Sequence, residues 1–213
     1  MKQILVYSDS LSWGIIPMTR NRFAFNQRWP GILELSLNAQ GKSVRVIEDC
    51  LNGRRTMYED PIKPGRNGLV GLPQRIEINS PLSLVVLMLG TNDFQANHDH
   101  TAMNAQHGMR ALINAIRNTN LEPGMLMPEI LVVAPPPIYL PQGDIAAKFK
   151  GAENKCVGLA RNYQALCHEL KCHFFDAASV TTSSKIDGVH FDIDQHLAFG
   201  KAITTFIHNK NLV

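Results

Sequence analysis

Three residues near the two ends of this sequence have side chains that together can carry out a nucleophilic attack. Ser10 follows an apolar run at the N-terminus, and Asp187 and His190 lie three residues apart near the C-terminus. At that spacing the carboxylate can bond one ring nitrogen of the imidazole, which leaves the other nitrogen free to accept the serine proton. The combination predicts that Ser10 attacks a carbonyl carbon while His190, oriented by Asp187, acts as the base.

Two other segments offer donors of the kind that stabilise a negatively charged oxygen. Gly53 has no Cβ, so its amide can approach a substrate closely, and Asn92 carries a side-chain amide. With the Ser10 amide they predict an oxyanion hole for a tetrahedral intermediate. Each segment taken alone is also compatible with a plain turn, and Ser10 taken alone with a helix cap.

The residues between these segments predict alternating strands and helices. Apolar runs rich in β-branched residues predict buried strands at residues 3–7, 43–47, 84–89, 129–134 and 173–175. Helical spacing of apolar residues predicts helices at residues 30–39, 101–118, 146–170 and 195–208. We expect loops at residues 59–73 and 135–143, which are rich in Pro and Gly.

This alternation predicts an α/β fold, a flavodoxin-like three-layer α/β/α sandwich with a five-stranded parallel sheet, formed as a single domain over residues 1–213. Ligands of such sheets bind beyond the carboxyl ends of the strands. Ser10, Gly53 and Asn92 each follow a strand, and His190 precedes the final helix, so we expect all four to meet at that edge. A flavin- or nucleotide-binding module would use the same edge, but the chain has no GxGxxG or Walker sequence. It also lacks the GxSxG elbow of the larger α/β-hydrolase family.

Composition excludes several other classes of protein. The net charge is only +3 and no run of basic residues occurs, which argues against nucleic acid as a partner. No apolar stretch is long enough to span a membrane. The four cysteines have neither disulfide-scaffold density nor zinc-site spacing, so we expect reduced thiols. The apolar run at residues 3–7 is too short for a signal peptide and no small-residue cleavage site follows it, so we expect a cytoplasmic location.

One cluster of residues has side chains that can bind metals. It consists of His98, Asp99, His100 and His107. Three ligands in a fixed tetrahedral arrangement are not evident in it, so a solvated loop is the favoured interpretation. We therefore predict no metal site and no cofactor.

The ordered set of Ser10, Gly53, Asn92 and His190 blocks resembles that of the SGNH (GDSL-type) hydrolases. Further segments are similar to the bacterial arylesterase and acyltransferase branch: 10–14, 28–29, 46–48, 87–93, 132–137, 174–177 and 187–191. The resemblance implies hydrolysis of short-chain acyl esters, including aryl acetates and acetylated sugars, with acyl transfer to alcohols as a further activity. Thioesterases and lysophospholipases of the same family are the alternative.

The branch also implies a homo-oligomer, in some members an octamer. If this holds here, the loops at residues 15–27, 59–74 and 135–148 are candidate interfaces. One residue departs from the family pattern, because Ser8 stands where Gly is usual. We expect a modest change in the turn, with Asp9 holding that turn through hydrogen bonds to nearby backbone amides.

Apolar side chains beside the catalytic segments are candidates for contact with a small-molecule ester, because such pockets are mostly apolar. Ordinary packing in the core or between subunits is the alternative interpretation. The candidates are Trp13, Ile15, Phe94, Pro136, Tyr139 and Phe191.

Overall fold

The computed structural model describes all residues, 1–213, and contains one five-stranded sheet. Its strands are β1 (Lys2–Ser8), β2 (Val44–Cys50), β3 (Leu84–Met88), β4 (Glu129–Ala134) and β5 (His173–Asp176). They are all parallel and lie in the order β2-β1-β3-β4-β5. The predicted fold class is confirmed.

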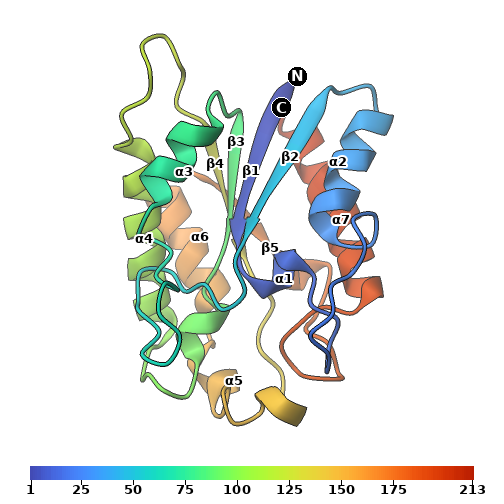
Figure 1. Cartoon of the computed structure of the whole chain (residues 1–213), viewed down its shortest axis with the longest axis vertical. Coiled ribbons are helices and arrows are strands. Elements are labelled where there is room, and N and C mark those ends of the chain that lie inside the picture. The colour runs from blue at the N-terminus through green and yellow to red at the C-terminus, as the bar shows by residue number, and fades with distance from the viewer.

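Helices cover both faces of this sheet (Figure 1). On one face lie α2 (Trp29–Ala39) and α7 (Ile193–Asn209), and on the other lie α3 (Leu72–Asn79), α4 (Ala102–Arg117) and α6 (Leu159–Leu170). Successive residues of a strand point to opposite faces, so Leu5 and Tyr7 of β1 join one hydrophobic cluster and Ile4 and Val6 the other. This two-sided burial explains why the strands are almost entirely apolar.

Short elements follow several strands at their carboxyl ends. The helix α1 (Ser10–Trp13) follows β1, and the 3-10 helix η1 (Thr91–Phe94) follows β3. Two further 3-10 helices are η2 (Gly143–Ile145) and η3 (Ala177–Ser179). These elements lie at the edge where the sequence predicts the site.

The predicted helix at 146–170 is wrong in its extent. The structure has turns, then α5 (Ala152–Lys155), and only then α6. Gly151 and Gly158 have φ angles of 78° and 87°, and this left-handed backbone cannot continue a helix. The sequence predicts no helix at α3, because the loop expected at residues 59–73 extends to the second residue of this helix. In addition, β2 continues to Cys50, three residues beyond its predicted end.

No helix of the structure is long and apolar enough to cross a membrane. All four cysteines are free thiols, and three of them are buried.

Candidate active site

Ser10, His190 and Asp187 come together at the carboxyl ends of the strands. The Ser10 Oγ lies 3.1 Å from His190 Nε2, and His190 Nδ1 lies 2.7 Å from Asp187 Oδ2. Ser10 begins α1 directly after β1, whereas the other two residues lie on the loop before α7. All three side chains are buried, with Ser10 and His190 each 7% exposed.

The loop that carries Asp187 and His190 is held by the aspartate itself. Its Oδ1 accepts from the amides of Val189 and His190, both at 2.9 Å. Burial alone would raise the pKa of Asp187, but hydrogen bonds from the His190 ring and from these amides outweigh burial and leave the pKa below its ordinary value. The carboxylate is therefore charged at neutral pH and can stabilise an imidazolium.

Potential hydrogen-bond donors line the same cavity as the Ser10 hydroxyl. The backbone amides of Ser10 and Gly53 donate no hydrogen bond within the protein. Both residues line one cavity of ≈ 230 Å³ together with Asn92 and His190. Two unpartnered amides beside a nucleophile can bind a negatively charged oxygen.

The side chain of Asn92 is oriented by several partners. Its Nδ2 donates to Asp9 Oδ2 at 2.9 Å and more weakly to the Arg54 carbonyl at 3.2 Å. Its Oδ1 accepts from Gln95 Nε2 at 2.8 Å. These contacts fix the orientation of the amide, and both hydrogens of Nδ2 already have an acceptor. A substrate oxygen that binds Nδ2 would compete with the Arg54 carbonyl for one of them.

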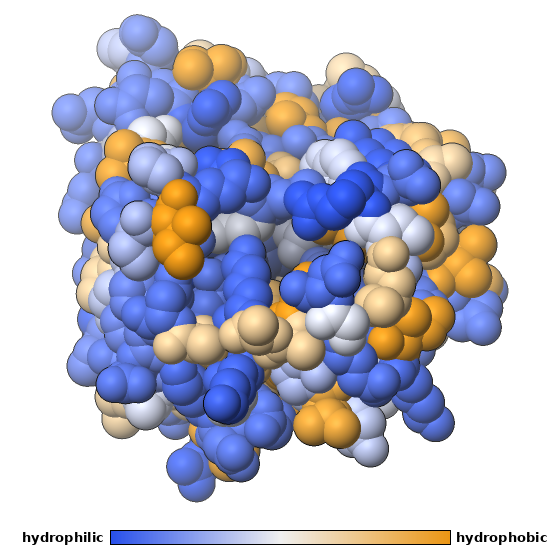
Figure 2. Space-filling view, turned by 60° about the horizontal axis from the view of Figure 1, so that its bottom comes forward, coloured by the Kyte–Doolittle hydropathy of each residue, from blue (hydrophilic) through white to orange (hydrophobic).

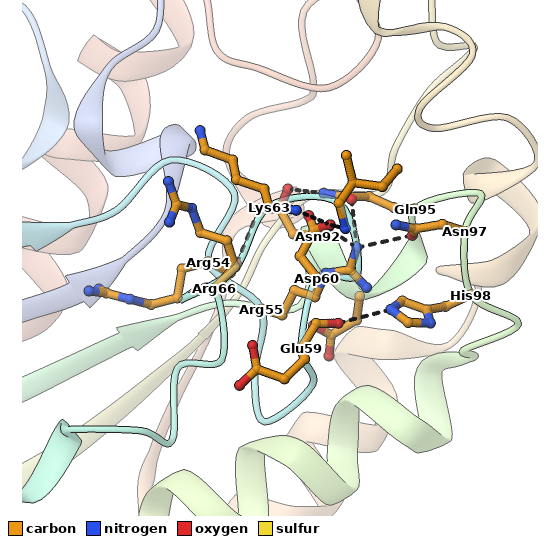
Figure 3. A network of polar contacts seen from close by, with 12 residues as sticks. Arg54, Arg55, Glu59, Asp60, Lys63, Arg66, Asn92, Gln95, Asn97 and His98 are labelled. Carbon is orange, nitrogen blue, oxygen red and sulfur yellow. Dashed lines mark hydrogen bonds and ion pairs between the residues drawn. The ribbon is translucent and has the colours of Figure 1, made fainter.

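A buried chain of polar side chains continues behind Asn92 (Figure 3). Gln95 Oε1 accepts from Arg55 Nη2 at 2.7 Å, and the guanidinium of Arg55 lies 3.4 Å from Asp60. The Nε and Nη1 atoms of Arg55 are buried without a partner. Gln95 lies three residues after Asn92 and directly follows η1, and its role has no separate signal in the sequence.

Asp9 holds the turn after β1, as predicted. Its Oδ1 accepts from the Leu11 amide at 2.9 Å, and its Oδ2 accepts from Asn92. Burial raises the pKa of Asp9 to about 6, although these hydrogen bonds oppose the rise. The carboxyl therefore joins the Ser10 turn to η1 as well as capping α1.

Ser8, the departure from the family pattern, takes part in a buried chain of hydroxyl groups. Its Oγ donates to the Met88 carbonyl at 2.7 Å and lies 2.5 Å from Ser12 Oγ. Ser12 Oγ also accepts from Trp29 Nε1 at 3.1 Å. Because the single Ser8 hydrogen is donated to Met88, Ser12 must donate to Ser8. The added side chain thus bonds β3 to α1 and leaves Ser10 in place.

Only one of the six predicted substrate-contact residues lines the cavity beside Ser10. That residue is Ile15. Phe191 and Phe94 are fully buried in the two core clusters, so the interpretation as core residues applies to both. Pro136 is buried and lines a different cavity with Phe94.

The remaining two candidates also lie elsewhere. Tyr139 is 62% exposed and lines a separate surface cavity. Trp13 lies under the guanidinium of Arg22, which is 4.8 Å from its ring centre.

Seven further residues line the cavity and were not predicted from the sequence. Five of them lie in the segments 15–27, 59–74 and 135–148, which the family resemblance marks only as candidate interfaces. Asn52 has a signal in its position next to Gly53. The missed lining residues are Arg20, Asn52, Lys63, Asp144, Ile145, Lys148 and Phe149.

The predicted solvated cluster lies in the loop before α4 and in α4. The rings of His98 and His100 stack at 4.5 Å, and His98 Nε2 lies 3.1 Å from the Glu59 carbonyl. The structure has no group of three or more His, Cys, Asp or Glu side chains arranged to hold a metal ion.

Comparisons with known proteins agree in fold along nearly the whole chain. The model of the GDSL-like lipase/acylhydrolase family matches residues 9–199. An aryl esterase from M. smegmatis has a TM-score of 0.92 and 36% sequence identity, covering 98% of this chain and 99% of that chain. A carbohydrate acetylesterase family member from Sinorhizobium meliloti has a TM-score of 0.91 and 37% identity, covering 98% of each. A search of curated proteins finds no match. With the family model matching most of its length, the chain belongs to the GDSL-like lipase/acylhydrolase, or SGNH, family.

Proposed function

We propose that this protein is a serine carboxylic-ester hydrolase that acts on short-chain acyl esters, such as aryl acetates and acetylated sugars, through an acyl-enzyme. One observation carries the proposal. The hydroxyl of Ser10 lies within hydrogen-bond reach of an imidazole that is itself bonded to a buried carboxylate, and all of this opens onto a cavity.

In the first step the Ser10 Oγ attacks the ester carbonyl carbon while His190 Nε2 takes its proton. The carbonyl oxygen becomes negative and is bound by the amides of Ser10 and Gly53 and by the Nδ2 of Asn92. His190 then gives the proton to the departing alkoxide or phenoxide as the carbon–oxygen bond breaks. The products are the alcohol and an ester of Ser10.

In the second step a water molecule attacks the acyl carbon of that ester. His190 takes the proton of the water and returns it to the Ser10 Oγ as the acyl group leaves. An alcohol in place of water would give a new ester by the same steps, so acyl transfer belongs to the same proposal.

Two observations support a preference for short acyl groups. The cavity is small, and its apolar lining is limited to Ile15, Ile145 and Phe149. The similar solved structures include an aryl esterase and carbohydrate acetylesterases.

A series of p-nitrophenyl esters measures this preference for short acyl groups, and highest activity at long chains would favour the lysophospholipase alternative. Acyl-CoA substrates tested in parallel measure the thioesterase alternative.

The decisive experiment replaces the nucleophile. Ser10→Ala is expected to abolish turnover of p-nitrophenyl acetate and labelling by a fluorophosphonate, because no other hydroxyl is paired with His190. Peptide mapping of the labelled wild-type protein should identify Ser10. Ser12→Ala is the matched control and should still be labelled at Ser10, because the Ser12 hydroxyl is bonded to Ser8 and Trp29 and not to His190. Near-wild-type activity in Ser10→Ala would end the proposal.

The protein is further proposed to act as a homo-oligomer. Exposed large apolar side chains support this, because several lie in the three loops that the family resemblance marks as candidate interfaces. They are Met18, Ile62, Val70, Tyr139 and Leu140. Light scattering coupled to size-exclusion chromatography measures the mass, and a monomer at micromolar concentration would contradict the proposal.

The proposed location is the cytoplasm. Four free cysteines support it, since thiols stay reduced there. Cell fractionation followed by immunodetection tests this location, and recovery outside the cytoplasmic fraction would contradict it.

A further inference from the structure

The cavity beside Ser10 has an uneven distribution of charge at its mouth. Three basic side chains line it, those of Arg20, Lys63 and Lys148, against one acidic side chain at the mouth, that of Asp144. All four are at least partly exposed to solvent. Three positive charges and one negative charge leave a net charge of +2 on this rim. In the space-filling view from the carboxyl ends of the strands, the surface is mainly hydrophilic and hollowed near its centre (Figure 2).

The three cations are not neutralised by contact with carboxylates. None of them forms an ion pair within 4.0 Å, whereas Arg28 and Arg54 nearby are paired with Glu48 and Asp49. Lys63 points away from the buried polar chain described above (Figure 3). Within one subunit, their charges therefore remain available to a molecule that enters the cavity.

Asp60 is the carboxylate that could neutralise these cations, but its oxygens already have partners. Its carboxylate accepts from the amides of Ile62 and Lys63 and lies 3.4 Å from the guanidinium of Arg55. A further cation, Arg66, donates from Nε to the Asn52 carbonyl at 3.1 Å and has no acidic partner. It lies against the turn that carries the Gly53 amide, within 3.7 Å of the position of a Cβ there.

The cations also influence one another. Burial lowers the pKa of Lys148, and the charges of Lys63, Arg55 and Arg20 lower it further, whereas Asp60 opposes the change. Charges that repel across a shared space are stabilised by an anion placed between them. The rim therefore favours an anionic group over a neutral one of the same size.

We propose that this site selects esters whose alcohol portion carries an anionic group, a carboxylate or a phosphate, held at the cavity mouth by Arg20, Lys63 and Lys148. This inference rests on the proposed esterase activity of Ser10. The anion lies on the alcohol portion because the proposed acyl group is short and occupies the region next to the oxyanion donors. Acetylated sugar acids and acetylated sugar phosphates are two classes of ester whose alcohol portion carries such an anionic group.

The experiment compares acetate esters that differ in charge. The substrates are 4-acetoxybenzoate, 4-acetoxyphenyl phosphate and the neutral methyl 4-acetoxybenzoate, each measured as kcat/KM. A triple variant, Arg20→Gln with Lys63→Gln and Lys148→Gln, is compared with wild type. For each protein, the kcat/KM of an anionic ester is divided by that of the neutral ester. Comparing this ratio between the variant and the wild type cancels the different reactivity of the leaving groups.

At low ionic strength the ratio is expected to fall about tenfold in the triple variant. Added salt should lower it in the wild type, because screening shortens the reach of exposed charges. Lys150→Gln, which removes an exposed cation of the same segment that does not line the cavity, should leave the ratio unchanged. The two anionic substrates show whether carboxylate or phosphate is preferred.

An unchanged ratio in the triple variant would overturn the inference while leaving the esterase proposal intact, since the neutral ester is still cleaved. The esterase proposal itself fails only if Ser10→Ala keeps activity. If the triple variant does not fold, product inhibition of the wild type gives a second measurement. 4-Hydroxybenzoate should inhibit more strongly than its methyl ester, and equal inhibition would count against the inference.

Discussion

Asn92 uses both ends of its amide before any substrate arrives. Gln95 fixes the oxygen, and Asp9 and the Arg54 carbonyl accept from the nitrogen. Preorganised donors stabilise a developing charge because they need not reorient during the reaction. We therefore regard Gln95 as a positioning residue, which acts on the reaction only through Asn92.

This role gives a prediction for Gln95→Glu. The new carboxylate has nearly the same shape and can still accept from Arg55, but it cannot donate to the Asn92 oxygen when ionised. The Asn92 amide then loses its fixed orientation, so kcat for p-nitrophenyl acetate should fall roughly 10-fold to 100-fold with little change in KM. Steady-state kinetics measure both constants.

Two controls separate positioning from structure. Gln74→Glu makes the same chemical change on the exposed surface of α3 and should leave kcat unchanged. Asn92→Ala should lower kcat roughly 10²-fold to 10³-fold, and Gln95→Glu should add little on that background. A wild-type kcat in Gln95→Glu would show that Asn92 does not depend on this contact.

At the scale of elements, buried carboxyl groups join the turns that form the site. Asp9 bonds the turn after β1 to η1, and Asp93 in η1 accepts from the amide and the hydroxyl of Thr56 at 2.9 and 2.5 Å. Burial raises the pKa of each carboxyl to about 6, against these hydrogen bonds. The folded protein therefore holds these protons more tightly than the unfolded chain does.

This shift predicts how stability depends on pH. A folded-state pKa above the unfolded value of 3.8 gives stability that is fully present below 3.8 and is lost as the pH rises through about 6. Asp93→Asn removes that ionisation and keeps both contacts, because its amide can donate to the Thr56 hydroxyl and its oxygen can accept from the Thr56 amide. Its melting temperature should fall less between pH 4 and pH 8 than that of the wild type.

Differential scanning calorimetry across this pH range measures the effect. Asp99→Asn, a change of the same kind on an exposed loop residue, is the control and should follow the wild-type curve. Parallel curves for wild type and Asp93→Asn would show that Asp93 does not carry this pH dependence.

Some helices and strands could be predicted from the sequence, and others could not. Uninterrupted apolar runs such as those of β3 and β4 predicted strands correctly, because a strand buried on both faces has few alternatives. The region after β4 was predicted poorly. Its apolar spacing fits a helix, and the left-handed glycines at 151 and 158 decide where that helix is broken.

At the scale of the whole molecule, the sequence could predict that Ser10, Asn92 and His190 meet, because parallel strands bring their carboxyl ends to one edge. It could not predict the lining of the cavity. Lys63 and Lys148 lie on irregular loops, and their approach to Ser10 depends on how those loops pack. Phe191 was predicted to contact substrate because it follows His190, but its side chain lies in the core. Adjacency in the chain does not decide which way a side chain points.

The loop that carries His190 is bonded to the exposed loop after β4. Tyr139 and Gln142 donate backbone hydrogen bonds to the carbonyls of Gly188 and Asp187 at 2.9 and 3.0 Å. A Cβ at Gly188 would lie 2.3 Å from the Leu140 carbonyl, so the two loops are in direct contact. Tyr139 and Leu140 are exposed. A cross-linker or a solid support attached to them would therefore tend to displace the loop that carries His190. Attachment through α3 would leave it undisturbed, which makes that helix the better anchor for an immobilised form.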